Sequence, residues 1–401
     1  MVKTIDYSQT QLIYSVFQNA IESRASDIHL DPTRDAFSVR FRIDGVLYAT
    51  DTFKKELQEE LVSQIKVLSQ LDITETRSPQ DGHFEFAVGG RGYNMRVSTF
   101  PTVYGEAIVL RILNREDVLM PLENLGFTES QLQSLPDLIH HPHGIILITG
   151  PSASGKTTLL YSILQVLKKP ENNIITVEDP VELQMENIRQ VQIHEGTGLT
   201  FAQAMRGILR QDPDIVMVGE IRDAETLQMA TQAALSGRLV FSTFHTFNTP
   251  ALIIRLLEMG IPTSVVAHAL VGIVAVRLVR KICPSCAAPY APSALEERMA
   301  GGPRQSRNFR RGKGCEHCRN SGYVGRTGVF EVLPFDEQVK SHILEGKSPS
   351  LLPQLFREKG IESLEEVALK KTLEGITTIE EVVRVLGVLP SAAASSKKSE
   401  T

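Results

Sequence analysis

The chain has 401 residues, a length typical of two or three domains with sizeable cores. An apolar content of 42%, a charged content of 22% and a net charge of −5 are ordinary for a globular protein and argue against a chain built mainly to coat nucleic acid. No apolar run approaches the roughly 18 residues of a transmembrane helix, and the first residues lack a secretory signal, so we expect a cytosolic protein in which structural disulfides are rare.

Residues 1–113 predict a small α+β domain. Apolar side chains recur at helical spacing in two segments and alternate with polar ones in others, as in strands with one buried face. Gly89-Gly90 marks a hairpin. The expected elements are helices at residues 12–21 and 54–71 and strands at residues 25–30, 37–43, 84–88, 92–99 and 107–113.

Arginines stand on several of these predicted strands. Each can face solvent on the polar side of a sheet, or it can reach a nucleotide that another domain or subunit holds. Arg111 is the strongest candidate for such a contact, because a charge within a buried run needs a partner. The four arginines are Arg40, Arg42, Arg96 and Arg111.

Residues 114–123 break the pattern and are predicted to be a linker. The domain expected at residues 124–282 has four short apolar runs separated by helical patterns, which indicates an α/β fold with buried parallel strands. The runs are Ile145–Thr149, Ile174–Glu178, Ile215–Gly219 and Leu239–Thr243.

The first run leads into Gly150-Pro-Ser-Ala-Ser-Gly155-Lys156-Thr157, which fits the G-x-x-x-x-G-K-[ST] loop that binds nucleotide phosphates. A helical pattern follows, so the motif has the setting it requires, with backbone N–H groups facing the phosphates. Lys156 is expected to reach the β- and γ-phosphates of ATP, and Thr157 to supply an oxygen to Mg²⁺. The residues predicted to bind nucleotide are Gly150, Pro151, Ser152, Ala153, Ser154, Gly155, Lys156, Thr157, Thr158 and Asp179.

The other three runs also end in polar groups, and ligands bind beyond the carboxyl ends of strands in such sheets. Glu220 is our choice for the carboxylate that orients the attacking water. Glu178 and Asp179 would hold Mg²⁺ or its waters, and His245 would contact the γ-phosphate. Two alternatives remain open: Glu220 as an acid in the first turn of a helix at residues 221–234, and His245 as a core histidine.

The four cysteines form two C-x-x-C pairs separated by 28 residues, a strong signal for zinc. Four thiolates leave no open position, so a structural Zn²⁺ is expected in a region spanning residues 283–318, with a loop at 289–308. Unlinked core thiols or a redox pair are the alternatives. Residues 319–389 predict a helical region and residues 390–401 a disordered tail. The predicted ligands are Cys283, Cys286, Cys315 and Cys318.

In six short sequence motifs, the chain resembles the type II secretion and type IV pilus assembly ATPases, and the resemblance extends over residues 8–389. That resemblance implies a RecA-like P-loop motor domain behind a PAS-like N-terminal domain. The motifs are Ser26–Leu30, Val39–Gly45, Arg96–Glu106, Thr176–Glu182, Leu209–Asp223 and Gly322–Gly328.

The resemblance further implies a hexameric ring ATPase at the cytoplasmic face of the inner membrane, acting on a membrane platform protein. It makes Thr176–Glu182 the family's Asp box and Ser242–Asn248 its His box. Arg96 and Arg111 match the N-terminal-domain arginines that reach nucleotide, although Arg206, Arg210 and Arg222 of the motor domain are candidates too. The cysteine region resembles that of secretion and pilus-extension motors, which pilus-retraction motors lack.

Three departures from the family pattern matter. Ser152 and Ala153 replace Thr and Gly in the phosphate loop, and alanine loses easy access to positive φ if its position needs it. Ser236-Gly-Arg238 stands where the family has Thr-Gly-His, so one histidine is missing. The chain is also expected to lack the extra N-terminal domain that docks many relatives to a membrane-anchored partner.

Other functions remain to be weighed against this one. A nucleic-acid motor with the same core is disfavoured because the chain is acidic overall, has no Trp and shows no basic–aromatic stripe. A scaffold that only binds nucleotide is disfavoured by the intact Lys156, Thr157, Glu178 and Glu220. The sequence does not separate secretion from pilus extension or DNA-uptake pili.

Overall fold

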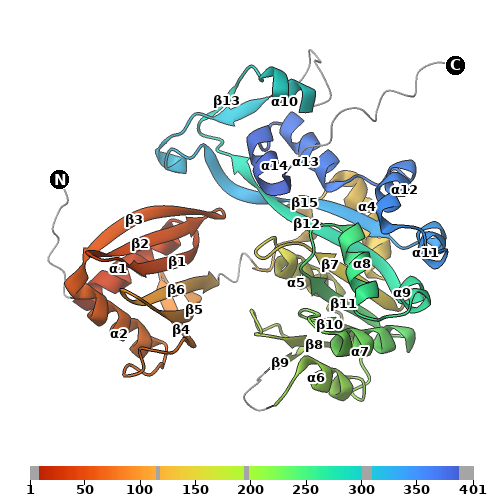
Figure 1. Ribbon diagram of the computed structural model, residues 1–401, viewed down its shortest axis with the longest axis horizontal. Helices are drawn as coiled ribbons and strands as arrows, with labels where there is room; N and C mark the ends of the chain where they lie inside the picture. Colours follow the sequence, from red (N-terminus) through yellow and green to blue (C-terminus); the bar gives the residue numbers. More distant parts are fainter. Residues whose placement is uncertain (1–8, 114–117, 194–197, 300–308, 388–401) are drawn as a thin grey trace. The chain divides into compact units, whose positions relative to one another are not determined.

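The computed structural model describes residues 9–113, 118–193, 198–299 and 309–387, and the chain divides into two compact units, residues 1–118 and 119–401 (Figure 1). Part of the predicted linker, part of the predicted cysteine-region loop and the predicted disordered tail lie outside the described residues. Within those described, no helix has the length and apolarity needed to cross a membrane.

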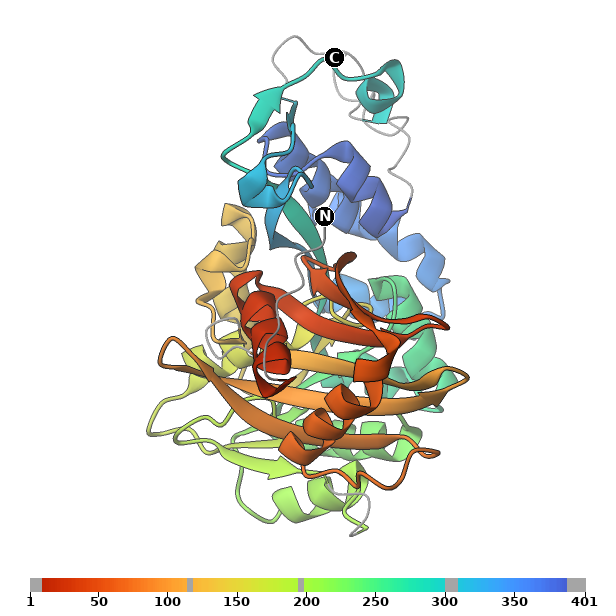
Figure 2. The same ribbon diagram turned by 90° about the vertical axis from the view of Figure 1, so that its left-hand side faces the viewer.

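The N-terminal unit is an antiparallel sheet with two helices on one face (Figure 2). Its core is formed by apolar side chains of the helices and of alternate strand positions, such as Phe17, Ile65, Phe37 and Met95. The strand order is β3-β2-β1-β6-β5-β4. The elements are α1 (Gln9–Glu22), β1 (Ala25–Pro32), β2 (Ala36–Ile43), β3 (Val46–Lys54), η1 (Lys55–Leu57), α2 (Gln58–Leu68), β4 (Gln80–Val88), β5 (Arg91–Thr102) and β6 (Gly105–Leu113).

Two elements of the N-terminal unit differ from the predictions made from the sequence. Strand β3 was not predicted, because it is an edge strand whose side chains are half-buried or exposed and carry no alternating pattern. The helix predicted at residues 54–71 is shorter than expected, since its start is the 3₁₀ turn η1.

The second unit is built on a seven-stranded sheet with the order β15-β12-β7-β11-β10-β8-β9. All neighbouring strands are parallel except β15, which is antiparallel to β12. The four predicted apolar runs are four of these strands, which confirms the parallel sheet. The strands are β7 (Gly144–Thr149), β8 (Ile174–Glu178), β9 (Arg189–Gln192), β10 (Ile215–Val218), β11 (Leu239–Phe244), β12 (Leu270–Ile282) and β15 (Tyr323–Pro334).

Helices cover both faces of this sheet. Ile145 and Leu147 of β7 belong to a core cluster formed with helices on one face. On the other face, the Leu138 side chain lies so close to Gly272 of β12 that a Cβ there would be 2.5 Å away. The helical segments are η2 (Leu122–Asn124), α4 (Glu129–Ile139), α5 (Lys156–Leu167), α6 (Phe201–Ile208), α7 (Ala224–Leu235), α8 (Thr249–Glu258), α9 (Thr263–Ala269), α11 (Glu337–Leu344), η5 (Pro349–Leu351), α12 (Leu352–Glu358), α13 (Leu364–Leu373) and α14 (Ile379–Leu386).

The region predicted to be helical at residues 319–389 begins instead with a strand. Strand β15 pairs along most of β12, so the sheet extends beyond the predicted core boundary at residue 282. The segment gave no strand signal because Gly325, Arg326 and Glu331 interrupt its apolar residues. The predicted helices after residue 335 are present.

A small module follows β12. Strands β13 (Ala287–Pro289) and β14 (Arg310–Gly312) pair antiparallel, and a 3₁₀ turn, η4 (Glu316–Cys318), precedes β15. The segment predicted as a loop at residues 289–308 contains a short helix, α10 (Ala294–Met299).

Candidate functional site

The loop between β7 and α5 is packed tightly against β12. A Cβ at Gly150 would lie 2.5 Å from Ser154 Oγ and 2.6 Å from the Val276 carbonyl oxygen, so no side chain fits there. Gly155 precedes α5 with φ of 94°, a conformation that glycine adopts at little cost. The Ser154 hydroxyl is buried and hydrogen-bonds to no group among the described residues. This tight backbone, ending in a helix N-terminus, suits a phosphate group.

Ala153 departs from the family's glycine at a position where the difference matters. Its φ is 59°, in the left-handed region that disfavours a residue with a Cβ. The position therefore does adopt the positive φ that was in question, and alanine adopts it at a cost of about 1 kcal/mol.

Lys156, the first residue of α5, is buried against its own loop. Its Nζ donates to the carbonyl oxygens of Gly150 at 2.8 Å and Pro151 at 2.9 Å and lies 3.4 Å from His245 Nδ1. Burial lowers the Lys156 pKa to about 8, an effect that the Arg277 charge reinforces and the Glu220 charge opposes. An anion beside this amine would favour its charged form.

Glu220 and His245 meet beyond the ends of neighbouring strands β10 and β11. His245 Nε2 lies 3.2 Å from Glu220 Oε2, and the side chains are 50% and 20% exposed. Helix α7 begins only at Ala224, with Asp223 as its N-cap. Glu220 is therefore not a first-turn acid, and since His245 is half exposed, it is not a core histidine.

Arg222 links Glu220 to the end of the next strand. Its Nη2 pairs with Glu220 Oε1, and its Nη1 lies 3.5 Å from Asp179 Oδ2. Asp179 follows β8, so the strand ends bring Lys156, His245, Glu220 and Asp179 into one chain of polar contacts.

Glu178 is set apart from this group. It is 3% exposed, and both carboxylate oxygens accept hydrogen bonds within a buried network. Oε1 accepts from Thr176 Oγ1 at 2.6 Å and from Gln190 Nε2 at 3.1 Å, while Oε2 accepts from the Tyr161 hydroxyl at 2.5 Å. Burial, with the nearby Glu178 charge, raises the pKa of Tyr161. Glu178 is thus held by protein donors, whereas Asp179 is partly exposed.

The remaining predicted loop residues lie at the surface or near it. Ser152 and Thr157 are exposed, and Pro151 and Thr158 are half-buried. Thr157 and Thr158 belong to the first turn of α5.

The N-terminal arginines share the open face of their own sheet. Arg96 of β5 and Arg111 of β6 are direct cross-strand neighbours, and both are exposed. Arg111 Nε donates to Asp27 Oδ1 at 2.9 Å, and Arg42 Nε lies 3.7 Å from Asp27 Oδ2. Strand β6 is buried only at alternate positions, so Arg111 does not lie in a buried run as expected, and its partner Asp27 is the buried member of the pair. Arg40 pairs with Asp31 at 2.8 Å on the same face.

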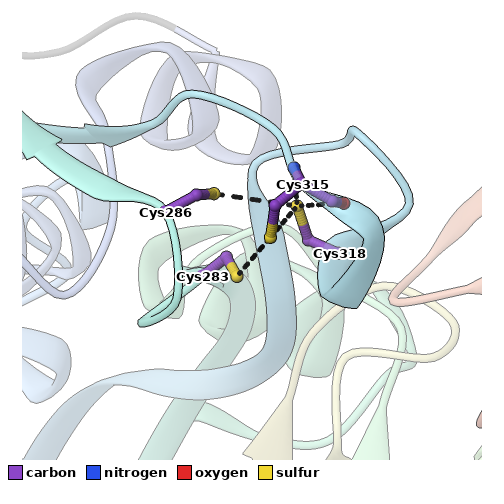
Figure 3. Close-up of side chains that lie close together, drawn as sticks. All are labelled: Cys283, Cys286, Cys315 and Cys318. Atoms are coloured by element: carbon purple, nitrogen blue, oxygen red, sulfur yellow. Dashed lines mark hydrogen bonds between the residues drawn. The ribbon is translucent and has the colours of Figure 1, made fainter.

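The four cysteine sulfurs converge at the end of β12 and at the turn before β15 (Figure 3). All lie within 4.8 Å of one another, with separations of 3.8 Å for Cys283–Cys315 and Cys286–Cys318 and 3.7 Å for Cys315–Cys318. These distances exceed a disulfide bond of about 2.05 Å. They match the roughly 3.8 Å expected between tetrahedral ligands that each lie about 2.3 Å from one zinc ion. The donor set therefore fits a closed metal site.

Two features of the site were not predicted from the sequence. The Thr149 and Thr246 hydroxyls lie 2.6 Å apart and tie the end of β7 to the loop after β11. Arg277 of β12 is buried, and its Nη1 lies 3.1 Å from the position a Cβ would take on Gly150. A charge inside the long apolar run of β12 was the available signal.

Comparison with known proteins gives the family. A family model described as type II/IV secretion system protein matches residues 5–384. The type II secretion system protein E of Dickeya dadantii is 46% identical over 375 residues, which cover 94% of this chain and 75% of that protein. The type IV pilus assembly ATPase PilB of Thermus thermophilus is 41% identical over 383 residues, covering 94% of this chain and 43% of PilB.

Among solved structures, the pilus retraction motor PilT with bound ADP is similar, with a TM-score of 0.62, 26% identity and coverage of 92% of this chain and 95% of PilT. The chain belongs to the type II/IV secretion system protein family. This confirms the expected family and the P-loop motor fold, while the PAS-like character of the N-terminal domain stays a prediction.

The strain at Ala153 generates the first prediction. Ala153→Gly should raise the free energy of unfolding by about 1 kcal/mol, because glycine relieves the left-handed backbone. Gln228→Gly, at an exposed position in the interior of α7, is the control and should lower it, since glycine weakens the middle of a helix. Urea denaturation measures both. Equal losses for the two variants would contradict the strain at Ala153.

Proposed function

We propose that this member of the type II/IV secretion system protein family is a motor that hydrolyses ATP to drive assembly of a pseudopilus or pilus. The observation that carries the proposal is the convergence of Lys156, Glu220 and His245 at the ends of parallel strands, beside the glycine-rich loop. The names of the relatives, a type II secretion protein E and a pilus assembly ATPase, support the same function.

Binding of the triphosphate would fall to the loop and to Lys156. The cradle at Gly150 leaves backbone N–H groups close to the ligand, and the start of α5 adds a partial positive charge. Lys156 Nζ would exchange its two loop carbonyls for phosphate oxygens. A magnesium ion, which neutralises developing charge on the phosphates, would be held by the exposed Thr157 and by Asp179.

Hydrolysis needs a group that orients the attacking water. In this proposal Glu220 accepts a hydrogen bond from that water and can take its proton, because its carboxylate lies at the site and not in a buried network. His245 and Arg222 hold the two carboxylate oxygens in place. Glu178 is a supporting residue: its bonds to Thr176, Tyr161 and Gln190 fix the strand end that carries Asp179.

The proposal also covers the oligomeric state of the motor and its place in the cell. The motor works as a homohexamer in the cytoplasm, at the inner face of the cytoplasmic membrane, and passes its motion to a membrane platform protein rather than to nucleic acid. The cluster of four cysteines holds a structural Zn²⁺ and favours secretion or pilus extension over retraction. In the ring, Arg96 and Arg111 approach the γ-phosphate when an N-terminal domain closes on a motor domain.

Substitutions of Lys156 and Glu220 should affect ATP binding and turnover differently. Lys156→Ala should abolish both ATP binding and turnover, whereas Glu220→Gln should bind ATP normally and lose turnover by about a hundredfold or more. Nucleotide affinity and phosphate release are the measurements. Lys169→Ala and Glu345→Gln, both at exposed positions, are controls that should keep wild-type rates. Normal hydrolysis by Glu220→Gln would show that another acid orients the water.

Arg96 and Arg111 of the N-terminal unit give a separate prediction. Arg96→Ala and Arg111→Ala should keep near-normal ATP affinity in the isolated subunit and lose at least about tenfold in turnover in the assembled ring, because they act on transition-state charge. Arg40→Ala breaks a comparable arginine–aspartate pair on the same sheet face, with Asp31, so it is the matched control for Arg111→Ala and should retain turnover. If both variants turn over normally, these arginines only stabilise their own sheet.

Zinc content tests the cysteine cluster. Purified protein should carry one Zn²⁺ per chain, and Cys315→Ser should release it and lower the melting temperature, because the binding free energy of a structural site also stabilises the fold. His317→Ala, two residues further along but outside the sulfur cluster, should retain the metal. Elemental analysis that finds no zinc in protein with four reduced thiols would rule the site out.

A further inference from the structure

Strands β12 and β15 carry two buried charged residues that none of the roles above uses. Arg277 is 5% exposed and Glu331 is 8% exposed. Arg277 pairs in register with Val329, and Ala275 with Glu331, so the two charged side chains are diagonal neighbours on one face of the sheet. Burying two charges costs free energy unless both side chains are hydrogen-bonded. The groups that bond to Arg277 and to Glu331 therefore indicate what each residue does.

Arg277 lies beside the phosphate loop at Gly150 and bonds to the loop that carries His245. Its Nη1 donates to the Val276 carbonyl at 2.8 Å, next to the place where Gly150 packs on β12. Its Nη2 donates to the Phe247 carbonyl. Phe247 lies two residues after His245, so this bond fixes the backbone of the loop that presents the histidine to Glu220.

Glu331 joins two helix starts. Its Oε1 accepts from the Thr249 hydroxyl at 2.5 Å. The backbone N–H of Leu364 lies near enough to act on the same carboxylate and lowers its pKa. Thr249 is the first residue of α8, directly after the His245 loop, and Leu364 is the first residue of α13. A buried carboxylate between two helix N-termini is favourably placed.

Further along β12, Arg280 and Glu381 form a buried ion pair that serves a purely structural role. Arg280 donates to Glu381 of α14 at 2.7 Å and 3.0 Å, and Glu381 also accepts from Arg384. These bonds tie β12 to α14 or lie within α14, so they do not involve the phosphate loop or the His245 loop. Arg280 is therefore a matched control for Arg277.

We propose that Arg277 and Glu331 are positioning residues, which hold the loop from His245 to Thr249 in the geometry for turnover and connect it to helix α13. The proposal deepens the proposed function, because it assigns further residues to the same site. It predicts that a change at this buried pair alters the rate of the chemical step while nucleotide binding is retained, and that α13 is coupled to the site through Glu331.

The sharpest test is at Thr249, because its substitutions change one hydroxyl and little volume. Thr249→Val removes the donor to Glu331 and should lower kcat by about tenfold with KM for ATP changed less than about twofold, whereas Thr249→Ser keeps the donor and should retain wild-type kcat. Arg277→Gln should, like Thr249→Val, lower kcat while leaving KM for ATP nearly unchanged. Arg280→Gln should lower the melting temperature without changing kcat.

The pH profile gives a readout that a merely structural role would not change. Burial raises the Glu331 pKa to about 7, against its ordinary 4.5, with Glu365 reinforcing the shift and Thr249, Leu364 and Arg277 opposing it. A raised folded-state pKa favours folding below about pH 4.5, and this contribution is lost as the pH rises through about 7. Wild-type kcat should rise from pH 6 to pH 8 as the carboxylate ionises and strengthens its bonds, and Glu331→Gln should flatten that rise and gain relative stability at pH 8.

A measurement without turnover separates this inference from the proposed function. In NMR spectra of the wild type and Thr249→Val, the His245 ring resonances, assigned with His245→Gln, should shift in Thr249→Val and stay in Thr249→Ser. If wild-type protein does not hydrolyse ATP, the proposed function fails and the resonances alone decide the inference. Unchanged resonances, or kcat values for Thr249→Val and Arg277→Gln equal to that of Arg280→Gln, would overturn it.

Discussion

The packing of Gly150 against strand β12 determines where the other groups of the site lie. With less than 3 Å between a Cβ at this position and the Val276 carbonyl, the loop backbone must lie directly on the strand. Lys156 is then buried under its own loop, and burial lowers its pKa. The same contact sets the loop beside Arg277, whose guanidinium reaches the neighbouring loop at Phe247. One steric constraint thus aligns the phosphate loop, the lysine and the histidine loop.

Two glutamates that end neighbouring strands have different roles because their surroundings differ. Glu178 lies within the fold, where three protein donors satisfy its oxygens. Glu220 follows Gly219, whose N–H donates to the Val177 carbonyl of β8 at 2.8 Å, and its carboxylate emerges among partly exposed side chains. The position of an acid at a strand end therefore does not decide its chemistry. The donors around it do, as expected for groups whose charge depends on desolvation and hydrogen bonding.

The sequence was most informative where a local pattern dictates the structure. Short apolar runs identified the parallel strands, and the spacing of glycine and lysine identified the phosphate loop, because both depend on neighbours in the chain. The closeness of Arg277 and Glu331 could not be predicted because it depends on the register of two strands far apart in sequence. Strand β15 escaped because Gly325, Arg326 and Glu331 interrupt its apolar residues, and its pairing with β12 joins segments far apart in the sequence. The positive φ of Ala153 was raised as a question that only backbone geometry could answer.

Strand β12 also connects the phosphate loop to the cysteine cluster. The strand runs from Arg277 beside the phosphate loop to Ile282, with a register shift in its pairing to β15 between Arg280 and Ile282, and Cys283 follows directly. At about 3.3 Å per residue this is about 20 Å of paired strand. A tilt of about 3° where the strand meets the loop would displace its far end by about 1 Å over that length. The strand would act as a lever arm, and the clamp of four sulfurs at its tip would keep the last residues from bending, so that a small rotation at the nucleotide becomes a larger movement at the opposite end of the domain.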